Sequence, residues 1–70
     1  MSDELILLGS LIRKRREQLG LSQEKLAEIC EFDRTYISMI ERGKRNPSFQ
    51  NLLRLCLGLN IKISKILGDF

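Results

Sequence analysis

The sequence predicts a single small all-α domain, and three observations support this prediction. Apolar residues recur every three or four positions, and no stretch alternates with the period of two that a half-buried strand requires. Polar residues suited to helix N-caps precede the apolar stretches, and Gly follows several of them. A chain of 70 residues, 43% of them apolar, buries only one small core. We therefore expect one compact domain over residues 1–70 that contains five short helices.

The first predicted helix covers residues 3–19. Asp3 is a suitable N-cap, and Gly20 is a suitable residue to end the helix. One face carries an apolar stripe, and Arg16 lies on that stripe where a core residue is expected. The other members of the stripe are Leu5, Leu8, Ile12 and Leu19.

Two short helices follow, joined by a connection at residues 31–33. Ser22 begins the first of them. Asp33 is the expected N-cap of the second, and Gly43 ends it. The buried face of the helix that Ser22 begins is expected to consist of Leu26, Ile29 and Cys30.

The C-terminal part is expected to form two more helices. Ser48 caps a helix that runs to about Leu57 and that Gly58 ends, and a last helix covers residues 63–67. The expected buried side of the longer helix comprises Phe49, Leu52, Leu55, Cys56 and Leu59.

This C-terminal part carries more apolar surface than one small core needs. From residue 52 to residue 67, ten of sixteen residues are Leu, Ile or Cys. A tightly wrapped core is one explanation, and a two-fold interface between two copies of the chain is the one we favour. The residues expected in that interface are Leu53, Leu57, Ile61, Ile63 and Ile66.

The composition argues against an enzyme. The chain has no His, and its two Cys lie too far apart in sequence for a zinc-knuckle spacing. No nucleophile–base pair or Gly-rich phosphate loop is present in the sequence. We therefore expect no catalytic residue, no metal and no cofactor. The sequence also has no signal peptide and no membrane span, so we expect a cytoplasmic protein without a membrane partner.

Arg16 and Glu41 each lie on or beside an apolar stripe, one on the first predicted helix and one on the third. A buried unpaired ion costs several kcal/mol, about as much as a small domain can tolerate losing. We therefore expect these two residues to form an ion pair with a structural role.

The third predicted helix separates into two faces when its residues are placed every 100°. Tyr36, Ile37 and Ile40 share one face. Arg pairs bidentately with guanine, Ser and Thr hydrogen-bond to either base, and short side chains admit a helix deep into the major groove. The opposite face carries such groups, namely Arg34, Thr35, Ser38, Met39 and Arg42. An ordinary solvated face is the alternative interpretation, and the combination of groups favours DNA.

Phosphate contacts are expected at both sides of that helix. Gln23 lies near the N-terminus of the second predicted helix, where free backbone N–H groups favour an anion. Lys44, Arg45 and Asn46 follow the third helix in a loop that is suited to grip the DNA backbone. The net charge of +3 is therefore concentrated around one helix, which suits a polyanionic partner.

Two stretches of the sequence resemble the lambda-repressor/Cro-like helix-turn-helix family. They are GLSQEKLA at residues 20–27 and TYISMIERGKRNPS at residues 35–48. Two positions depart from the family pattern: Glu31 replaces the usual Gly or Asn of the turn, and Lys62 replaces the Ser that often caps the last helix. Within the family, DRTYIS at residues 33–38 is most similar to the controller proteins of restriction–modification systems.

The resemblance implies that the second and third helices form the helix-turn-helix and that residues 34–42 enter the major groove. The residues that it places on bases are Arg34, Thr35, Ser38 and Met39. The residues expected on the sugar-phosphate backbone are Gln23, Tyr36, Arg42, Lys44, Arg45 and Asn46.

The sequence and the resemblance together predict a sequence-specific, homodimeric DNA-binding transcription regulator. Its partner is expected to be a pseudo-palindromic double-stranded operator, with RNA polymerase as a further possible partner through acidic residues such as Glu24 and Glu28. If the narrower resemblance holds, the protein both activates and represses the genes of a restriction–modification system. The alternatives are a small phage or plasmid repressor and an antitoxin-like protein-interaction module with the same fold.

Overall fold

The computed structural model of the protein describes residues 2–68 and residue 70, which form five α-helices and no strand. The all-α, five-helix architecture expected from the sequence is confirmed for this part of the chain. The helices are α1 (Asp3–Gln18), α2 (Gln23–Cys30), α3 (Arg34–Glu41), α4 (Phe49–Gly58) and α5 (Ile63–Leu67).

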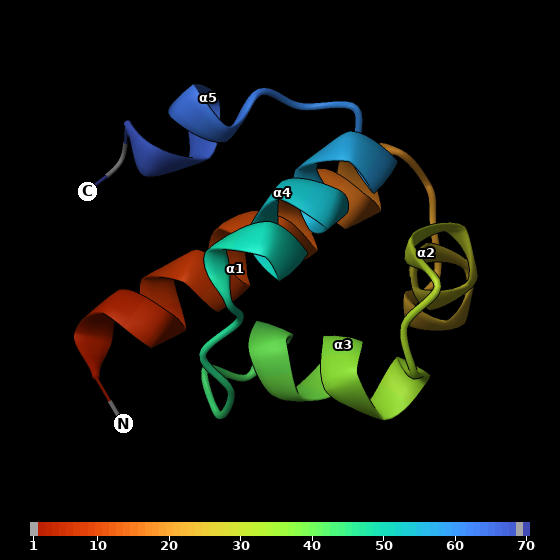
Figure 1. The fold of residues 1–70 in the computed structure, drawn as a ribbon, viewed down its shortest axis with the longest axis horizontal. Helices are drawn as coiled ribbons and strands as arrows, with labels where there is room; N and C mark the ends of the chain where they lie inside the picture. Colours follow the sequence, from red (N-terminus) through yellow and green to blue (C-terminus); the bar gives the residue numbers. More distant parts are fainter. Residues whose placement is uncertain (1, 69) are drawn as a thin grey trace.

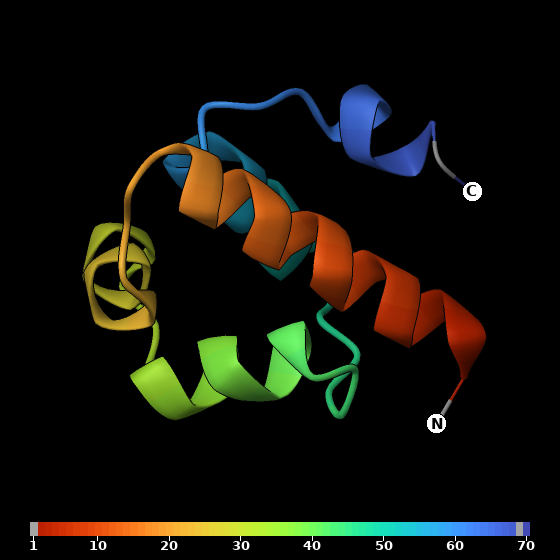
Figure 2. The same cartoon turned by 180° about the vertical axis from the view of Figure 1, so that it is seen from behind.

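Helix α3 lies along one edge of the molecule and α5 lies at the opposite edge, as both views of the fold show (Figures 1 and 2). Helix α3 packs against α1 and α2, and α2 packs also against α4. Helix α5 makes smaller contacts with α1 and α4. A partner bound at the outer face of α3 therefore leaves the α5 side of the molecule free.

The N-terminus of α1 is capped by Ser2, whose hydroxyl accepts a hydrogen bond from the backbone N–H of Leu5 at 3.3 Å. The prediction that Asp3 is the cap is therefore wrong by one position. Asp3 is the first residue inside the helix, where its negative charge still interacts favourably with the helix dipole.

Three further N-caps occupy the expected positions. The hydroxyl of Ser22 accepts from the backbone N–H of Lys25 at 3.0 Å, and that of Ser48 accepts from Asn51 at 3.1 Å. Asp33 stands at the N-cap of α3, but its side chain makes no capping hydrogen bond. The first N–H groups of α3 consequently depend on water or on another partner.

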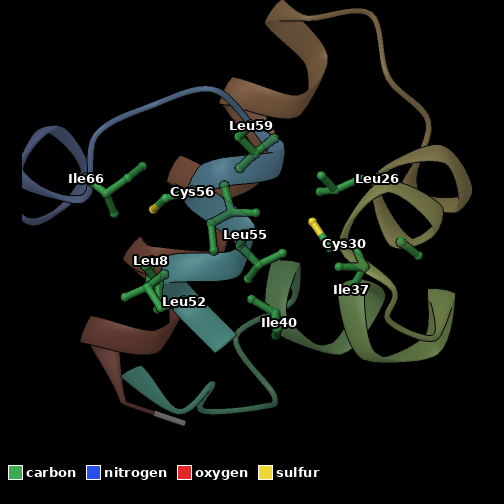
Figure 3. Packing of buried hydrophobic residues seen from close by; sticks show 12 residues of the cluster. Leu8, Leu26, Cys30, Ile37, Ile40, Leu52, Leu55, Cys56, Leu59 and Ile66 are labelled. Atoms are coloured by element: carbon green, nitrogen blue, oxygen red, sulfur yellow. The ribbon is translucent and has the colours of Figure 1, made fainter. Parts of the chain in front are cut away.

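Twelve apolar residues form one core cluster between the helices, and Figure 3 shows how they converge from all five helices. Three residues that the sequence placed on buried faces are exposed instead, namely Leu19, Ile29 and Phe49. Leu19 follows the last turn of α1, and Phe49 opens α4 before that helix meets the core. Ile29 is excluded because Leu26, Ala27 and Cys30 already fill the narrow buried stripe of α2.

Gly58 is the last residue of α4, one position beyond the predicted last residue Leu57. A Cβ at this position would lie 2.5 Å from the Sγ of Cys30, so the absence of a side chain lets α4 approach α2 closely. Leu59 is the C-cap of α4, and Asn60 follows with a positive φ of 51°. Asn tolerates this left-handed conformation better than most other residues, which explains how the chain turns without Gly there.

Gly9 brings α1 and α3 together. A Cβ at Gly9 would overlap the backbone carbonyl oxygens of Ile40 and Glu41, so only Gly permits this crossing. Arg15, two turns further along α1, donates hydrogen bonds to two carbonyls at the end of α4. Its Nε lies 2.9 Å from the oxygen of Leu59, and its Nη2 lies 3.0 Å from that of Asn60. Helix α1 therefore holds both α3 and α4 in place.

Within the described residues, none of the helices is long and apolar enough to span a membrane. The same residues contain no group of three His, Cys, Asp or Glu side chains placed to hold a metal ion. Cys30 and Cys56 are both free and buried. Burial raises the pKa of each thiol, which keeps both in the protonated form at neutral pH.

Candidate nucleic-acid interface

The outer face of α3 is polar and slightly hollowed. Arg34, Thr35, Ser38 and Arg42 line a shallow depression of about 250 Å³. The structure therefore brings together on one face four of the five residues that the sequence placed there. The fifth, Met39, is partly buried beside them and does not line the depression.

The inner face of α3 fixes the direction of this polar surface. Ile37 and Ile40 are completely buried in the core, with Ile40 beside the crossing at Gly9. Rotation of α3 about its axis would expose both residues, so the outer face cannot turn without loss of core packing. The orientation of the polar face is therefore a property of the folded chain.

The Arg42 side chain lies back along α3. Its Nε donates a hydrogen bond to the backbone carbonyl of Ser38 at 3.3 Å. This contact keeps the guanidinium close to the depression and leaves its Nη groups free to contact an anion. Arg34 and Arg42 thus place positive charge at the two ends of the helix.

The turn between α2 and α3 depends on Glu31, which adopts a left-handed conformation with a φ of 59°. The backbone N–H of Phe32 then reaches the carbonyl of Ala27 at 2.8 Å and closes the end of α2. A positive φ at a residue with a side chain, such as Glu31, costs about 1–2 kcal/mol. The second departure from the family pattern is Lys62, which occupies the N-cap position of α5. Its side chain makes no capping hydrogen bond, yet α5 still forms.

Tyr36 is held by three neighbours. Its hydroxyl accepts a hydrogen bond from the side-chain amide of Asn51 at 3.0 Å. Its ring meets that of Phe32 edge-on, with 5.0 Å between centroids. The guanidinium of Arg45 lies over the same ring, 5.4 Å from its centroid. Because Arg54 lies over Phe32 at 4.9 Å, two cation–π contacts flank the aromatic pair.

The loop after α3 presents its three polar residues to solvent, since Lys44, Arg45 and Asn46 are all exposed. The loop begins at Gly43, whose φ of 73° and whose close contact with Ile6 both require Gly. The backbone N–H of Lys44 bonds back to the carbonyl of Met39 at 2.8 Å. The contact with Ile6 and this hydrogen bond fix the start of the loop beside the polar face of α3.

Arg16 and Glu41 form the expected ion pair beneath this surface. The Nε of Arg16 lies 2.7 Å from Oε2 of Glu41, and its Nη2 lies 3.0 Å from Oε1. Only 11% of the Arg16 side chain and 2% of the Glu41 side chain are exposed. The hydrogen bonds to Glu41 hold the pKa of Arg16 above its ordinary value, although burial acts in the opposite direction. Loss of one partner from such a pair costs about 3–5 kcal/mol.

A third side chain joins the pair, a contact that was not predicted from the sequence. Nε2 of Gln23 donates to Oε1 of Glu41 at 3.1 Å, so Gln23 lies half-buried against α3. The remaining donor of Arg16, Nη1, reaches the carbonyl of Leu21 at 2.8 Å. The Glu41 carboxylate thereby connects α1, α2 and α3.

A groove on the opposite side of the molecule contains most of the residues expected to form a dimer interface. Leu53, Leu57, Ile61 and Ile63 line an open groove of about 770 Å³. Leu57, in the last turn of α4, is 82% exposed and is the most exposed of these four residues. Ile66 was also assigned to this interface, and that assignment is wrong: only 3% of Ile66 is exposed, because it points from α5 into the core near Cys56 (Figure 3).

Sequence reasoning missed the contact between Asn51 and Tyr36. Asn51 lies on α4, 15 positions from its partner Tyr36, and no local pattern relates two residues at that separation. The available signal was a polar residue on the inner half of a mostly apolar helix, which often indicates a hydrogen-bond partner.

Comparison with known proteins identifies the fold and its class. A family model described as helix-turn-helix matches residues 12–66. The control protein C.MunI from a Mycoplasma species is 44% identical over 70 residues, covering 99% of this chain and 95% of the relative. These matches span the polar face of α3, the turn at Glu31 and the groove.

Solved structures of similar proteins agree. The restriction–modification controller protein C.AhdI from Aeromonas hydrophila superimposes with a TM-score of 0.90 and 38% identity, covering 93% of this chain and 98% of that one. The C.Esp1396I controller, a tetramer in complex with its natural 35-base-pair operator, superimposes with a TM-score of 0.90 and 35% identity, covering 99% and 91%. The chain therefore belongs to the helix-turn-helix family and, within it, to the control proteins of restriction–modification systems, which are DNA-binding transcription regulators.

Proposed function

We propose that two copies of this chain bind a pseudo-palindromic operator, with α3 of each copy in the major groove of one half-site. The observation that carries the proposal is the polar depression on α3, where Arg34, Thr35, Ser38 and Arg42 face outward from a helix whose other side is locked in the core. A merely solvated helix face does not need two guanidinium groups around two short hydroxyl side chains. The similar C.Esp1396I controller forms a complex with its operator as a tetramer, which supports operator binding by more than one copy of the chain.

Base recognition is assigned to residues on the outer side of α3. Arg34 is suited to bidentate hydrogen bonds with O6 and N7 of guanine, and the methyl group of Thr35 is suited to contact thymine. Ser38 accepts from or donates to either base. Met39, which is partly buried, supplies an apolar contact at the edge of the same face.

Phosphate contacts are assigned to residues on both sides of α3. Arg42 and the exposed loop cations carry charge, whereas Gln23 and Tyr36 offer neutral donors. The full set is Gln23, Tyr36, Arg42, Lys44, Arg45 and Asn46. Such contacts set the position of α3 on the duplex and give binding its salt dependence.

Dimerisation is assigned to the groove that Leu57 borders. The groove is lined by residues of α4 and of the segment leading into α5, and α5 lies at the edge opposite α3 (Figure 1). Two chains that bury this groove against each other therefore keep both α3 helices accessible. In related dimers the two half-sites lie one helical turn apart, about 34–36 Å.

The regulatory role follows from the family. We propose that the protein acts in the cytoplasm and controls its own gene together with the gene of a restriction endonuclease. Glu24 and Glu28 on the exposed side of α2 are the proposed contact with RNA polymerase. This role requires binding alone and involves no catalytic step.

The proposal is tested by selection of bound DNA from a random pool, followed by mobility-shift competition with the DNA upstream of the gene. A two-fold symmetric site that also occurs upstream of the gene supports the proposal. Recovery of DNA without symmetry, or equal competition by unrelated DNA at all salt concentrations, contradicts it. When cationic residues of the proposed interface are replaced by Ala, Arg13→Ala is the control for the loss of one positive charge, because Arg13 is an exposed residue of α1.

A further inference from the structure

The Glu41 carboxylate is the acceptor for two different side chains, and only one of them was expected. Arg16 donates two hydrogen bonds to it, at 2.7 Å and 3.0 Å. Gln23 donates a third, from Nε2 to Oε1 at 3.1 Å. Arg16 comes from α1, Gln23 from the start of α2, and Glu41 from the end of α3. The pair thus extends to a residue that faces the proposed DNA surface.

This contact determines which way the amide of Gln23 points. An ionised carboxylate only accepts hydrogen bonds, so the NH₂ group of Gln23 must face Glu41 and its carbonyl oxygen must face away. An NH₂ group has two N–H bonds, and Glu41 takes one of them. Within the described residues, the second N–H has no acceptor. Gln23 therefore keeps one oriented donor for a ligand.

The backbone beside Gln23 carries further free donors. Ser22 is the N-cap of α2, and its hydroxyl serves the N–H of Lys25. The backbone carbonyl of Ser22 accepts from the N–H of Leu26. The backbone N–H groups of Gln23 and Glu24 lie in the first turn of α2, where no carbonyl of the helix can accept from them. They are therefore also available to an acceptor outside the helix. The oriented amide of Gln23 adds a side-chain donor to these backbone donors.

We infer that Glu41 is a positioning residue for DNA binding, which holds the amide of Gln23 so that its second N–H donates to a phosphate of the operator. The inference rests on the proposed function and assigns a role to the buried ion pair beyond stability. Glu41 itself is almost completely buried and does not touch the DNA. Arg16 contributes indirectly, because its hydrogen bonds hold the Glu41 carboxylate to which Gln23 is bound.

The expected effect is a loss of affinity that does not depend on base sequence. Without Glu41 the Gln23 side chain must be ordered when DNA binds, and we expect the operator dissociation constant to rise about tenfold. Gln23 carries no charge, so its loss releases no counterions. The slope of the logarithm of affinity against the logarithm of salt concentration is therefore expected to stay the same.

The test is a double-mutant cycle on the full chain with its selected operator. One change replaces the ion pair by apolar residues, Arg16→Met with Glu41→Leu, because such replacements leave many proteins folded. The other change is Gln23→Ala, and the third protein combines both. Each change alone is expected to weaken binding about tenfold, and the combination is expected to bind no more weakly than Gln23→Ala alone.

Multiplicative losses in the combined protein would overturn the inference, as would unchanged affinity after replacement of the ion pair. A second measurement needs no substitution: in NMR spectra of the natural chain, addition of operator is expected to shift one side-chain amide proton of Gln23 much more than the other. Equal shifts of both protons would also overturn it. If the natural chain binds no operator at all, the proposed function fails, and the two failures are thereby distinguished.

Discussion

The side-chain amide of Asn51 donates a hydrogen bond to the hydroxyl of Tyr36 at 3.0 Å, and this bond joins α4 to the outer helix α3. A phenol that accepts one hydrogen bond still has its own proton to donate. Asn51 therefore leaves the hydroxyl proton of Tyr36 free to be donated to another acceptor.

Asn51→Ala is expected to weaken operator binding by about 1 kcal/mol, the usual net contribution of one hydrogen bond. The loss should be similar for the operator and for DNA with altered bases, because Tyr36 is assigned to the phosphate backbone. Mobility-shift titration measures both. Gln50→Ala, at the exposed neighbouring position of α4, is the control. An equal loss from Gln50→Ala would contradict the assignment.

Arg34 and Arg45 are expected to behave differently when each is replaced by Ala. Arg34→Ala should cost about 1–3 kcal/mol and relax the preference at one base position, because Arg34 is assigned to a base. Arg45→Ala should weaken binding to all sequences alike and reduce the salt slope by about one. Binding to a panel of single-base variants of the operator separates the two cases. Uniform loss from Arg34→Ala would exclude base recognition by this residue.

Leu57→Lys is expected to prevent dimerisation, because it places a charge in the apolar groove between two copies. Sedimentation at micromolar concentration should show the natural chain as a dimer and the variant as a monomer of 8.1 kDa. Ile29→Lys is the matched control: Ile29 is an exposed apolar residue on α2, outside the groove. A monomeric natural chain would remove the assignment of this groove.

Gly9→Ala is expected to destabilise the fold by at least about 2 kcal/mol, since the added Cβ overlaps the carbonyls of Ile40 and Glu41. Ser10→Ala is the control on the same helix, because Ser10 is exposed. Thermal unfolding followed by circular dichroism measures both. A melting midpoint for Gly9→Ala equal to that of Ser10→Ala would show that α1 and α3 separate without cost.

The two thiols give the expected dependence on alkaline pH. Burial raises the pKa of Cys30 and of Cys56 in the folded chain above that in the unfolded chain. The stability from keeping them protonated is complete below the unfolded pKa and is lost as the pH rises toward the folded pKa. We therefore expect unfolding in urea to become easier above about pH 9. Replacement of both residues by Ala should abolish this part of the pH dependence.

Alkylation of the same thiols provides an independent measurement. Native protein is expected to react with iodoacetamide far more slowly than unfolded protein at the same pH, because the thiolate is the reactive form and both groups are buried. Rapid reaction of the folded chain would contradict the burial of these residues.

The sequence predicted the helices well because their signals are local. Ser22 and Ser48 cap the helices that follow them, and the apolar period within each helix identifies most of the core. The polar face of α3 was also predictable, since the residues of one helix suffice to place side chains on one side or the other. Even Glu31, which departs from the family pattern, adopts the left-handed conformation that the turn requires.

The errors arose where distant parts of the chain decide the outcome. Gly58 packs against Cys30 so closely that a side chain would not fit, and nothing near Gly58 in sequence reports this contact. Ile66 is a core residue because α5 folds back over α4. Arg15 satisfies carbonyls 44 and 45 positions away. Sequence periodicity describes one helix at a time and does not reveal which helix covers which.

The crossing at Gly9 has a consequence for the kinetics of recognition. Because α1 meets α3 at backbone-to-backbone distance near Ile40 and Glu41, and the buried pair also holds Glu41, the C-terminal end of the outer helix is fixed in the free protein. Ordering of this helix therefore takes place during folding and not at the operator. The barrier to productive association then consists of orienting two rigid bodies, and electrostatic attraction between the basic face and the duplex speeds that search.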